Sequence, residues 1–187
     1  MRCGYAGGVL VALAKELNFT SPEIVIGGSG GASSLLYYLT QQYEDIETVA
    51  VDLLSSPQFI SLLRIRKIVD VDYLIDVIYK ERMPLDLARL SLIKSEYYIL
   101  VKNAENADIR YFSNTDEEDI YEILRATTAA PIVYRKKIAL GNSRYVDGST
   151  FSQLKKMIDK AIELGADKVL VIDCRTLMSK LPAYKEG

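Results

Sequence analysis

The sequence predicts a layered α/β domain with a largely parallel central sheet, and three observations lead to this fold class. Patterns typical of strands and helices alternate along the 187 residues. Two predicted strands, residues 23–26 and 169–172, are short apolar runs of the kind found in strands covered on both faces. The chain shows no repeat, linker or low-complexity segment, so we expect residues 1–187 to form a single domain.

The first forty residues predict a helix, a strand and a second helix in that order. Apolar residues recur at helical spacing over residues 6–17, and charged residues follow at once, which favours a helix over a signal peptide. Pro22 separates this helix from the strand at residues 23–26. A second helix is expected to begin near Gly30.

The rest of the chain continues the alternation. Residues 46–92 are predicted to be mostly helical, with Asp72 capping one of the helices. Further strands are predicted at residues 97–102, 109–112, 137–140, 144–146 and 169–172, and further helices at residues 116–126 and 151–164.

Composition and charge exclude several classes of function. The net charge is −2 and no block of basic residues occurs, so the sequence does not predict binding to nucleic acid. Two cysteines, Cys3 and Cys174, are too few for a disulfide framework, which indicates a reducing, cytoplasmic setting. No apolar run approaches the length of a membrane span.

Histidine is absent from the chain, and this restricts the chemistry further. A Ser-His-Asp triad, a Cys-His dyad and any metal site that contains histidine are excluded. Two cysteines cannot close a structural zinc site, so we expect no metal and no cofactor. A nucleophile in this chain must therefore use a carboxylate, a lysine or an amine as its base.

The segment Gly27-Gly28-Ser29-Gly30-Gly31 satisfies the pattern G-x-S-x-G. A predicted strand precedes it and a predicted helix follows, as a nucleophile elbow requires. Small residues allow the sharp turn, and the helix N-terminus lies close to the negative charge that develops during acyl transfer. The alternative is a glycine-rich turn or a phosphate cradle, but the signatures of a Walker loop and of a dinucleotide-binding turn are both incomplete here.

Asp147 is the candidate base for Ser29. It lies in Val146-Asp147-Gly148-Ser149, at the end of a predicted strand, from which its carboxylate can project toward the elbow while Gly148 permits a tight turn. An Asp-Gly pair alone is a common turn. The absence of histidine and the presence of Ser29 together favour the catalytic interpretation.

A Ser-Lys pair is the competing chemistry. Ser91 with Lys94, and Ser152 with Lys155, both match S-x-x-K. The companion motifs of the penicillin-recognising enzymes accompany neither match. We therefore interpret both as solvated helix or loop positions.

These motifs and several other stretches resemble the patatin-like phospholipases, in their bacterial branch. Residues 1–10 resemble the segment that follows the Gly-rich oxyanion loop of that family, and residues 27–31 match its G-x-S-x-G. Asp147-Gly148-Ser149 stands where the family has Asp-Gly-Gly or Asp-Gly-Ala. The resemblance extends over nearly the whole chain through residues 71–74, 83–86, 109–113 and 160–172.

The resemblance implies a three-layer α/β sandwich and a Ser-Asp dyad that hydrolyses ester bonds in lipids without a metal. Ser29 would attack the acyl carbonyl, Asp147 would accept the serine proton, and water would release the fatty acid. The implied partners are a lipid or phospholipid ester and the surface of a membrane, touched peripherally from the cytoplasm. No oligomeric state is implied.

The chain departs from the family at its ends. The first strand and oxyanion glycines of the family precede the segment with which this chain opens, so we expect a domain truncated at its N-terminus and short at its C-terminus. Arg2, Cys3 and Gly4, together with Gly30, are then the candidate oxyanion donors. The loss of one such donor typically lowers the rate about 10²–10³-fold.

Ser149 is a milder departure, because it replaces the small Gly or Ala of the family. Because the chain departs from the family at its ends, the alternative is that it is a truncated or non-catalytic patatin-like protein, which acts as a binding or scaffold module.

Overall fold

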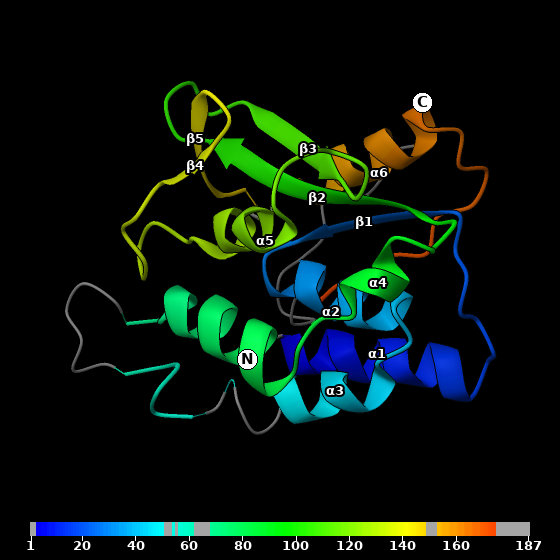
Figure 1. The fold of residues 1–187 in the computed structure, drawn as a ribbon. Helices are drawn as coiled ribbons and strands as arrows, with labels where there is room; N and C mark the ends of the chain where they lie inside the picture. Colours follow the sequence, from blue (N-terminus) through cyan, green and yellow to red (C-terminus); the bar gives the residue numbers. More distant parts are fainter. Residues whose placement is uncertain (1–2, 51–53, 55, 62–67, 149–152, 175–187) are drawn as a thin grey trace.

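Strands and helices alternate along the chain in a mixed α/β fold (Figure 1). The computed structural model describes residues 3–50, 54, 56–61, 68–148 and 153–174. The helices are α1 (Cys3–Lys15), α2 (Gly30–Leu39), α3 (Tyr43–Thr48), the π-helix η2 (Tyr73–Arg82), α4 (Leu87–Leu90), α5 (Ile120–Thr128) and α6 (Gln153–Glu163). The strands are β1 (Ile24–Gly28), β2 (Glu96–Asn103), β3 (Ile109–Ser113), β4 (Ile138–Leu140) and β5 (Ser143–Asp147).

The five strands form one sheet with β2 at its centre. β3 pairs with residues 98–102 along one edge of β2. On the other edge, β1 pairs with residues 96–100 and β5 pairs with residues 101–103. Because β3 already occupies one edge over the same positions, β1 and β5 must lie end to end along the other edge.

The prediction of a largely parallel sheet is wrong for the described strands. Only β1 and β2 run parallel, whereas β2–β3, β2–β5 and β4–β5 are antiparallel. Residues 104–108 connect β2 to β3, and residues 141–142 connect β4 to β5. Connections this short form hairpins, since a parallel crossover needs a dozen or more residues.

Helices lie on both faces of the sheet, and Figure 1 shows α6 on the opposite side from α1, α2 and α3. On the α2 face, the buried Tyr97 of β2 donates a hydrogen bond to the Ala32 carbonyl, 2.6 Å away. On the α6 face, burial raises the pKa of Tyr111 to about 12, with Asp159 and Glu163 of α6 adding to the shift. The core between the layers is apolar, with Leu36, Ile99, Val101, Phe112 and Leu124 fully buried.

Most predicted elements are confirmed with shifted boundaries, but two expectations fail. Asp72 does not cap η2 with its side chain; Asp70 does so instead, its carboxylate accepting from the Tyr73 N–H at 2.9 Å. Residues 169–172 form no strand, and Val169, Leu170 and Val171 are 41%, 63% and 40% exposed. An apolar run predicts burial, but a strand also needs a neighbour to pair with, and none of the described strands pairs with this segment.

Candidate active site

Ser29 lies in a sharp turn between the end of β1 and the start of α2. Its φ of 53° and ψ of −141° are unusual, because residues other than glycine rarely adopt positive φ. Ala32 N–H donates to the Ser29 carbonyl at 3.0 Å, which closes the first turn of the helix. This strand–turn–helix arrangement, with Ser29 half-buried, is the geometry that the G-x-S-x-G pattern predicted.

The outer glycines of the motif have different surroundings. A Cβ at Gly27 would lie 2.9 Å from the Ala32 Cα and 2.8 Å from Leu35 Cδ1, so β1 and α2 can approach this closely only without a side chain there. A Cβ at Gly31 would meet nothing within 4 Å. Gly27 is therefore required by close packing, whereas Gly31 is not.

The backbone of Ser29 is held by a residue that sequence reasoning missed. Its N–H donates to the hydroxyl of Thr127 at 2.9 Å, and that hydroxyl donates to the Leu100 carbonyl at 2.6 Å. Thr127 is fully buried near the end of α5. No local pattern distinguishes Thr127 from its neighbour Thr128, so only the tertiary structure reveals the contact.

The register of the sheet brings Asp147 to the Ser29 turn. Gly28, the last residue of β1, pairs with Leu100, and Asp147, the last residue of β5, pairs with Val101. Consecutive positions on a strand are about 3.3 Å apart, so the C-terminal ends of β1 and β5 meet on the same edge of β2. Two candidate residues that are far apart in the sequence thus lie at one junction of the sheet.

Two contacts fix the end of β5 in place. The Asp147 N–H donates to the Ala129 carbonyl at 3.0 Å, just beyond α5. A Cβ at Gly148 would lie 2.9 Å from the Val101 carbonyl carbon and 3.0 Å from the Lys102 nitrogen. Gly148 therefore lets the chain press against the backbone of β2 as it leaves Asp147, which is half-buried.

The structure describes three of the four candidate oxyanion donors, Cys3, Gly4 and Gly30. Gly30 is the first residue of α2, and the first N–H groups of a helix have no partner within it, so this N–H can donate to an external oxygen. Cys3 and Gly4 belong to the first turn of α1, a helix that packs against α2 and α3. Arg2 lies outside the described residues, and so does Ser149.

The lysines of the competing Ser-Lys interpretation have other positions. Lys94 precedes β2, six residues before Leu100, which separates it from the Ser29 end of β1 by about 20 Å along the strand. The Lys155 ammonium on α6 pairs with Asp159 at 2.8 Å. A base must come within hydrogen-bond reach of the nucleophile, which Lys94 does not.

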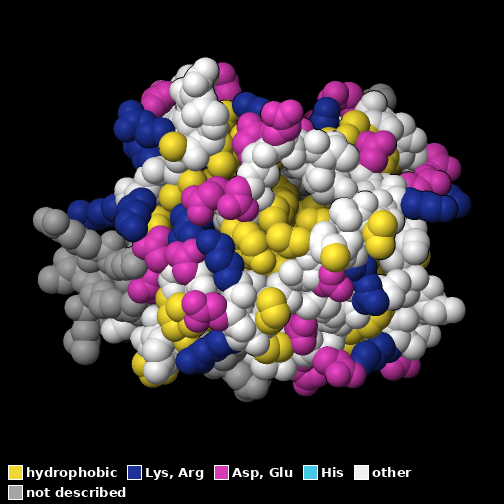
Figure 2. Space-filling model, in the orientation of Figure 1, with side chains coloured by type: hydrophobic (Ala, Val, Ile, Leu, Met, Phe, Trp, Pro, Cys, Tyr) yellow, Lys and Arg dark blue, Asp and Glu magenta, His cyan; other side chains and the backbone are white. Residues whose placement is uncertain are grey.

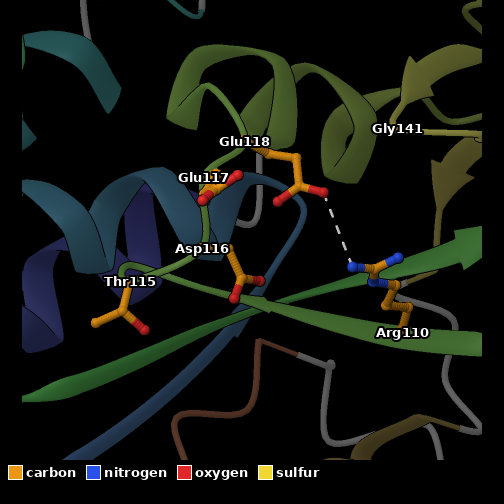
Figure 3. Close-up of a pocket in the computed structure, with 6 residues that line it drawn as sticks. All are labelled: Arg110, Thr115, Asp116, Glu117, Glu118 and Gly141. Carbon is orange, nitrogen blue, oxygen red and sulfur yellow. Dashed lines mark ion pairs between the residues drawn. The ribbon is translucent and has the colours of Figure 1, made fainter.

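The surface around the sheet combines apolar and charged areas. Figure 2 shows apolar side chains in a hollow near the middle of the visible face, in the area between α5 and α4, with charged side chains of both signs around it. A separate open recess lies at the β3 edge of the sheet, lined by Arg110, Thr115, Asp116, Glu117, Glu118 and Gly141 (Figure 3). Ser29 follows β1, on the other edge of β2.

Two of the charged groups in the recess form an ion pair with each other. Arg110 of β3 and Glu118 point toward each other across it, with Arg110 Nη2 3.8 Å from Glu118 Oε1 (Figure 3). Among the described residues, no group of three or more cysteine or acidic side chains is placed to hold a metal ion. Within the same residues, no helix combines the length and the apolar character that crossing a membrane requires.

Comparison with known proteins adds one relative. No family model matches the chain. The chain is similar to a protein of Escherichia coli (strain K12) that is called Uncharacterized protein YjjU, with 25% identity over 183 residues. The aligned region covers 95% of this chain and 49% of the relative, so the chain spans about half the length of the curated protein it matches.

Proposed function

We propose that this chain is a serine lipid acyl hydrolase of the patatin-like type, with a three-layer α/β fold, Ser29 as nucleophile and Asp147 as base. One observation carries the proposal: β1 and β5 end at adjacent residues of β2, so that the Ser29 turn and Asp147 adjoin. The positive φ of Ser29 supports it, because strained backbone is concentrated at functional sites.

The chemistry needs two half-reactions. The Ser29 hydroxyl oxygen attacks the acyl carbonyl while its proton passes to the Asp147 carboxylate, and the alcohol leaves with that proton. A water then attacks the acyl-enzyme, giving one proton to Asp147, and the fatty acid departs as Ser29 regains its hydrogen. The Gly30 N–H, at the positive end of α2, is the described donor for the oxyanion of both tetrahedral intermediates.

A lipid ester is the substrate class that the surface supports best. The apolar hollow in Figure 2 suits an acyl chain, because burying a methylene group contributes about 0.8 kcal/mol. Such a substrate resides in a membrane or micelle, so the proposal includes peripheral contact with a lipid surface.

Fluorophosphonate labelling tests the proposal. We expect the purified chain to be modified at Ser29, located by mass spectrometry, and expect Ser29→Ala to abolish the modification. Asp147→Asn should slow labelling and the hydrolysis of medium-chain nitrophenyl esters about 10²–10⁴-fold, the usual contribution of a general base. Asp159→Asn, which alters an exposed carboxylate on α6, is the matched control and should react as the unmodified chain does.

A folded chain that is not labelled, with circular dichroism typical of an α/β protein, would contradict the proposal. That result would favour the alternative, a non-catalytic protein that binds lipid or another partner. Equal labelling of the Asp147→Asn variant and the unmodified chain would retain Ser29 as nucleophile but remove Asp147 as its base.

A further inference from the structure

We propose that Thr127 is a positioning residue, whose hydroxyl holds the Ser29 backbone away from β2 in its reactive conformation. This inference rests on the proposed function, since it assigns a role in the same site. It begins from the two hydrogen bonds of the Thr127 hydroxyl, to the Ser29 N–H at 2.9 Å and to the Leu100 carbonyl at 2.6 Å.

The direction of both bonds follows from the partners. A carbonyl oxygen can only accept, so the Thr127 O–H must donate to Leu100, and its lone pairs must receive the Ser29 N–H. The single hydrogen of the hydroxyl is therefore committed to the Leu100 carbonyl, which fixes the orientation of the group. Because Thr127 is fully buried, no water replaces either bond without a rearrangement of the core.

The hydroxyl interrupts the ladder between β1 and β2 at its last step. The Glu96 N–H donates to the Glu23 carbonyl at 2.8 Å, which sets the phase of the parallel ladder. Continued along the strands in this phase, the Leu100 carbonyl would accept directly from the Ser29 N–H. The Thr127 hydroxyl bridges these two groups instead, so Ser29 is the position at which the chain leaves the sheet.

The same end of α5 also holds the other member of the dyad. Two residues beyond Thr127, the Ala129 carbonyl accepts the Asp147 N–H at 3.0 Å. Residues 127–129 therefore hold both Ser29 and Asp147 by hydrogen bonds to their backbone N–H groups. A shift of Thr127 changes the position of Ser29 relative to Asp147. Misplacement by about 1 Å can lower a rate about 10²-fold.

Removal of the hydroxyl gives a specific expectation. In Thr127→Val a methyl group replaces the hydroxyl that bridges the Ser29 N–H and the Leu100 carbonyl, so both backbone groups lose their partner and the Ser29 turn must shift to satisfy its N–H elsewhere. Thr127→Ser keeps the hydroxyl and should keep the geometry. Thr128→Val is the matched control, because within the described part of the chain the Thr128 hydroxyl bonds carbonyls of its own helix alone, those of Leu124 at 2.7 Å and Arg125 at 3.3 Å.

The experiment measures fluorophosphonate labelling of Ser29 in the full chain as a function of probe concentration, with amide hydrogen exchange at Ser29 as a second readout. We expect Thr127→Val to lower the maximal labelling rate at least about 10-fold, with the half-saturating probe concentration unchanged within about 3-fold. Thr127→Ser and Thr128→Val should label within about 3-fold of the unmodified chain. If the valine variant does not fold, Thr127→Ala removes the same hydroxyl without the added methyl contact.

Each outcome decides between the two proposals. Labelling of Thr127→Val at the unmodified rate, or equal losses in Thr127→Val and Thr128→Val, would overturn the positioning role and leave the proposed function standing. If the unmodified chain is not labelled at all, the proposed function fails. Amide hydrogen exchange at Ser29 then tests whether the Thr127 hydroxyl holds the Ser29 backbone. Altered exchange of the Ser29 N–H in the valine variant but not in the serine variant would then still support the positioning role, and unchanged exchange would refute it.

Discussion

Ser29 occupies a backbone conformation that costs about 1–3 kcal/mol for a residue with a side chain, and its neighbours explain why it persists. The Ser29 carbonyl is held by the first turn of α2 and its N–H by Thr127. Gly27 lets α2 fold back close enough to make the first of these contacts. The strain is thus maintained by residues on either side of the turn and across the core.

The two outer glycines of the motif should respond differently to the same substitution. Gly27→Ala places a methyl group within 2.9 Å of the Ala32 backbone, so we expect it to lower the free energy of unfolding by about 1–3 kcal/mol. Gly31→Ala meets open space inside a helix, so it should be neutral or stabilise by up to about 1 kcal/mol. Urea denaturation of both variants measures the difference, and equal losses would contradict the packing argument.

Individual site residues differed in how well the sequence predicted them. Ser29 and Asp147 could be singled out because their local patterns carry meaning without the rest of the fold. Thr127 could not, since its role depends on β1, β2 and α5 meeting at one point. Ala129 contributes through its backbone carbonyl, for which side-chain identity carries no signal.

At the scale of elements, a buried arginine joins α5 to η2. Arg125 is 7% exposed, and its guanidinium contacts Asp72 at 2.8 Å, Asp76 at 2.8 Å and Glu122 at 3.0 Å. Tyr134 and Lys136 bond the same Asp72 carboxylate, at 2.6 and 2.8 Å. This cluster, Arg125 with its three carboxylates, fixes α5, the helix whose C-terminal end holds Ser29 and Asp147.

Arg125→Leu should destabilise the chain by removing the only cation that all three carboxylates of this cluster share in the described structure. We expect a loss of about 1–3 kcal/mol, below the 3–5 kcal/mol typical of fully buried pairs, because Asp76 and Glu122 are 47% and 37% exposed. Arg144→Leu breaks an exposed pair with Glu105 and is the control, with an expected change under about 1 kcal/mol. Urea denaturation measures both.

The loss should also depend on pH. Partial burial opposes ionisation of Asp76, but hydrogen bonds from Arg125 and Lys80 outweigh it and hold its pKa below the ordinary 3.8. The unfolded chain therefore binds more protons near this pH, so the contribution is present above pH 3.8 and is lost as pH falls through the folded pKa. Stability of the unmodified chain should fall more steeply below about pH 4 than that of Arg125→Leu; parallel curves would refute the assignment.

Elements could be predicted where the local pattern decides the outcome. The runs that form β2, β3 and β5 and the amphipathic stretch of α6 are examples. The start of α5 was misplaced because Asp116 looks like a helix start but instead accepts the Ser113 N–H in a turn, at 2.9 Å, while Asp119 caps the helix. The strand prediction for residues 169–172 is wrong because a strand must pair with a neighbouring strand, and a local sequence pattern does not show whether one is present.

At the scale of the whole molecule, the junction of β1, β2 and β5 is the feature that the sequence could not reveal. Alternation of helices and strands predicts a largely parallel sheet, yet β5 enters the sheet antiparallel and meets β1 end to end. That arrangement depends on pairings between distant segments, Gly28 with Leu100 and Asp147 with Val101. The proximity of Ser29 and Asp147 was therefore a hypothesis from chemistry until the register placed both at one edge of β2.

The thirteen tyrosines give a test of how cooperatively this core holds together. Burial raises the pKa of Tyr38 and Tyr111 to about 12, and it also raises the pKa of Tyr37 and Tyr97 above the ordinary value. Because these pKa values exceed the value of 10.0 for an exposed phenol, the stability that the neutral forms contribute is fully present below pH 10 and is lost as pH rises. We expect phenolate absorbance to rise in two phases, the second coinciding with loss of circular dichroism.

Tyr111→Phe identifies one source of the alkaline loss. The buried Tyr111 hydroxyl has no hydrogen-bond partner among the described residues, so its removal should leave stability at neutral pH unchanged or raise it by about 1 kcal/mol. Tyr97→Phe, by contrast, removes the bond to the Ala32 carbonyl and should cost about 1 kcal/mol. In both variants the free energy of unfolding should fall less between neutral and alkaline pH than in the unmodified chain, because each variant has one phenol fewer to ionise. A single titration of all phenols near pH 10 with circular dichroism intact would contradict this account, because buried phenols would then ionise at the pH of exposed ones without loss of the fold.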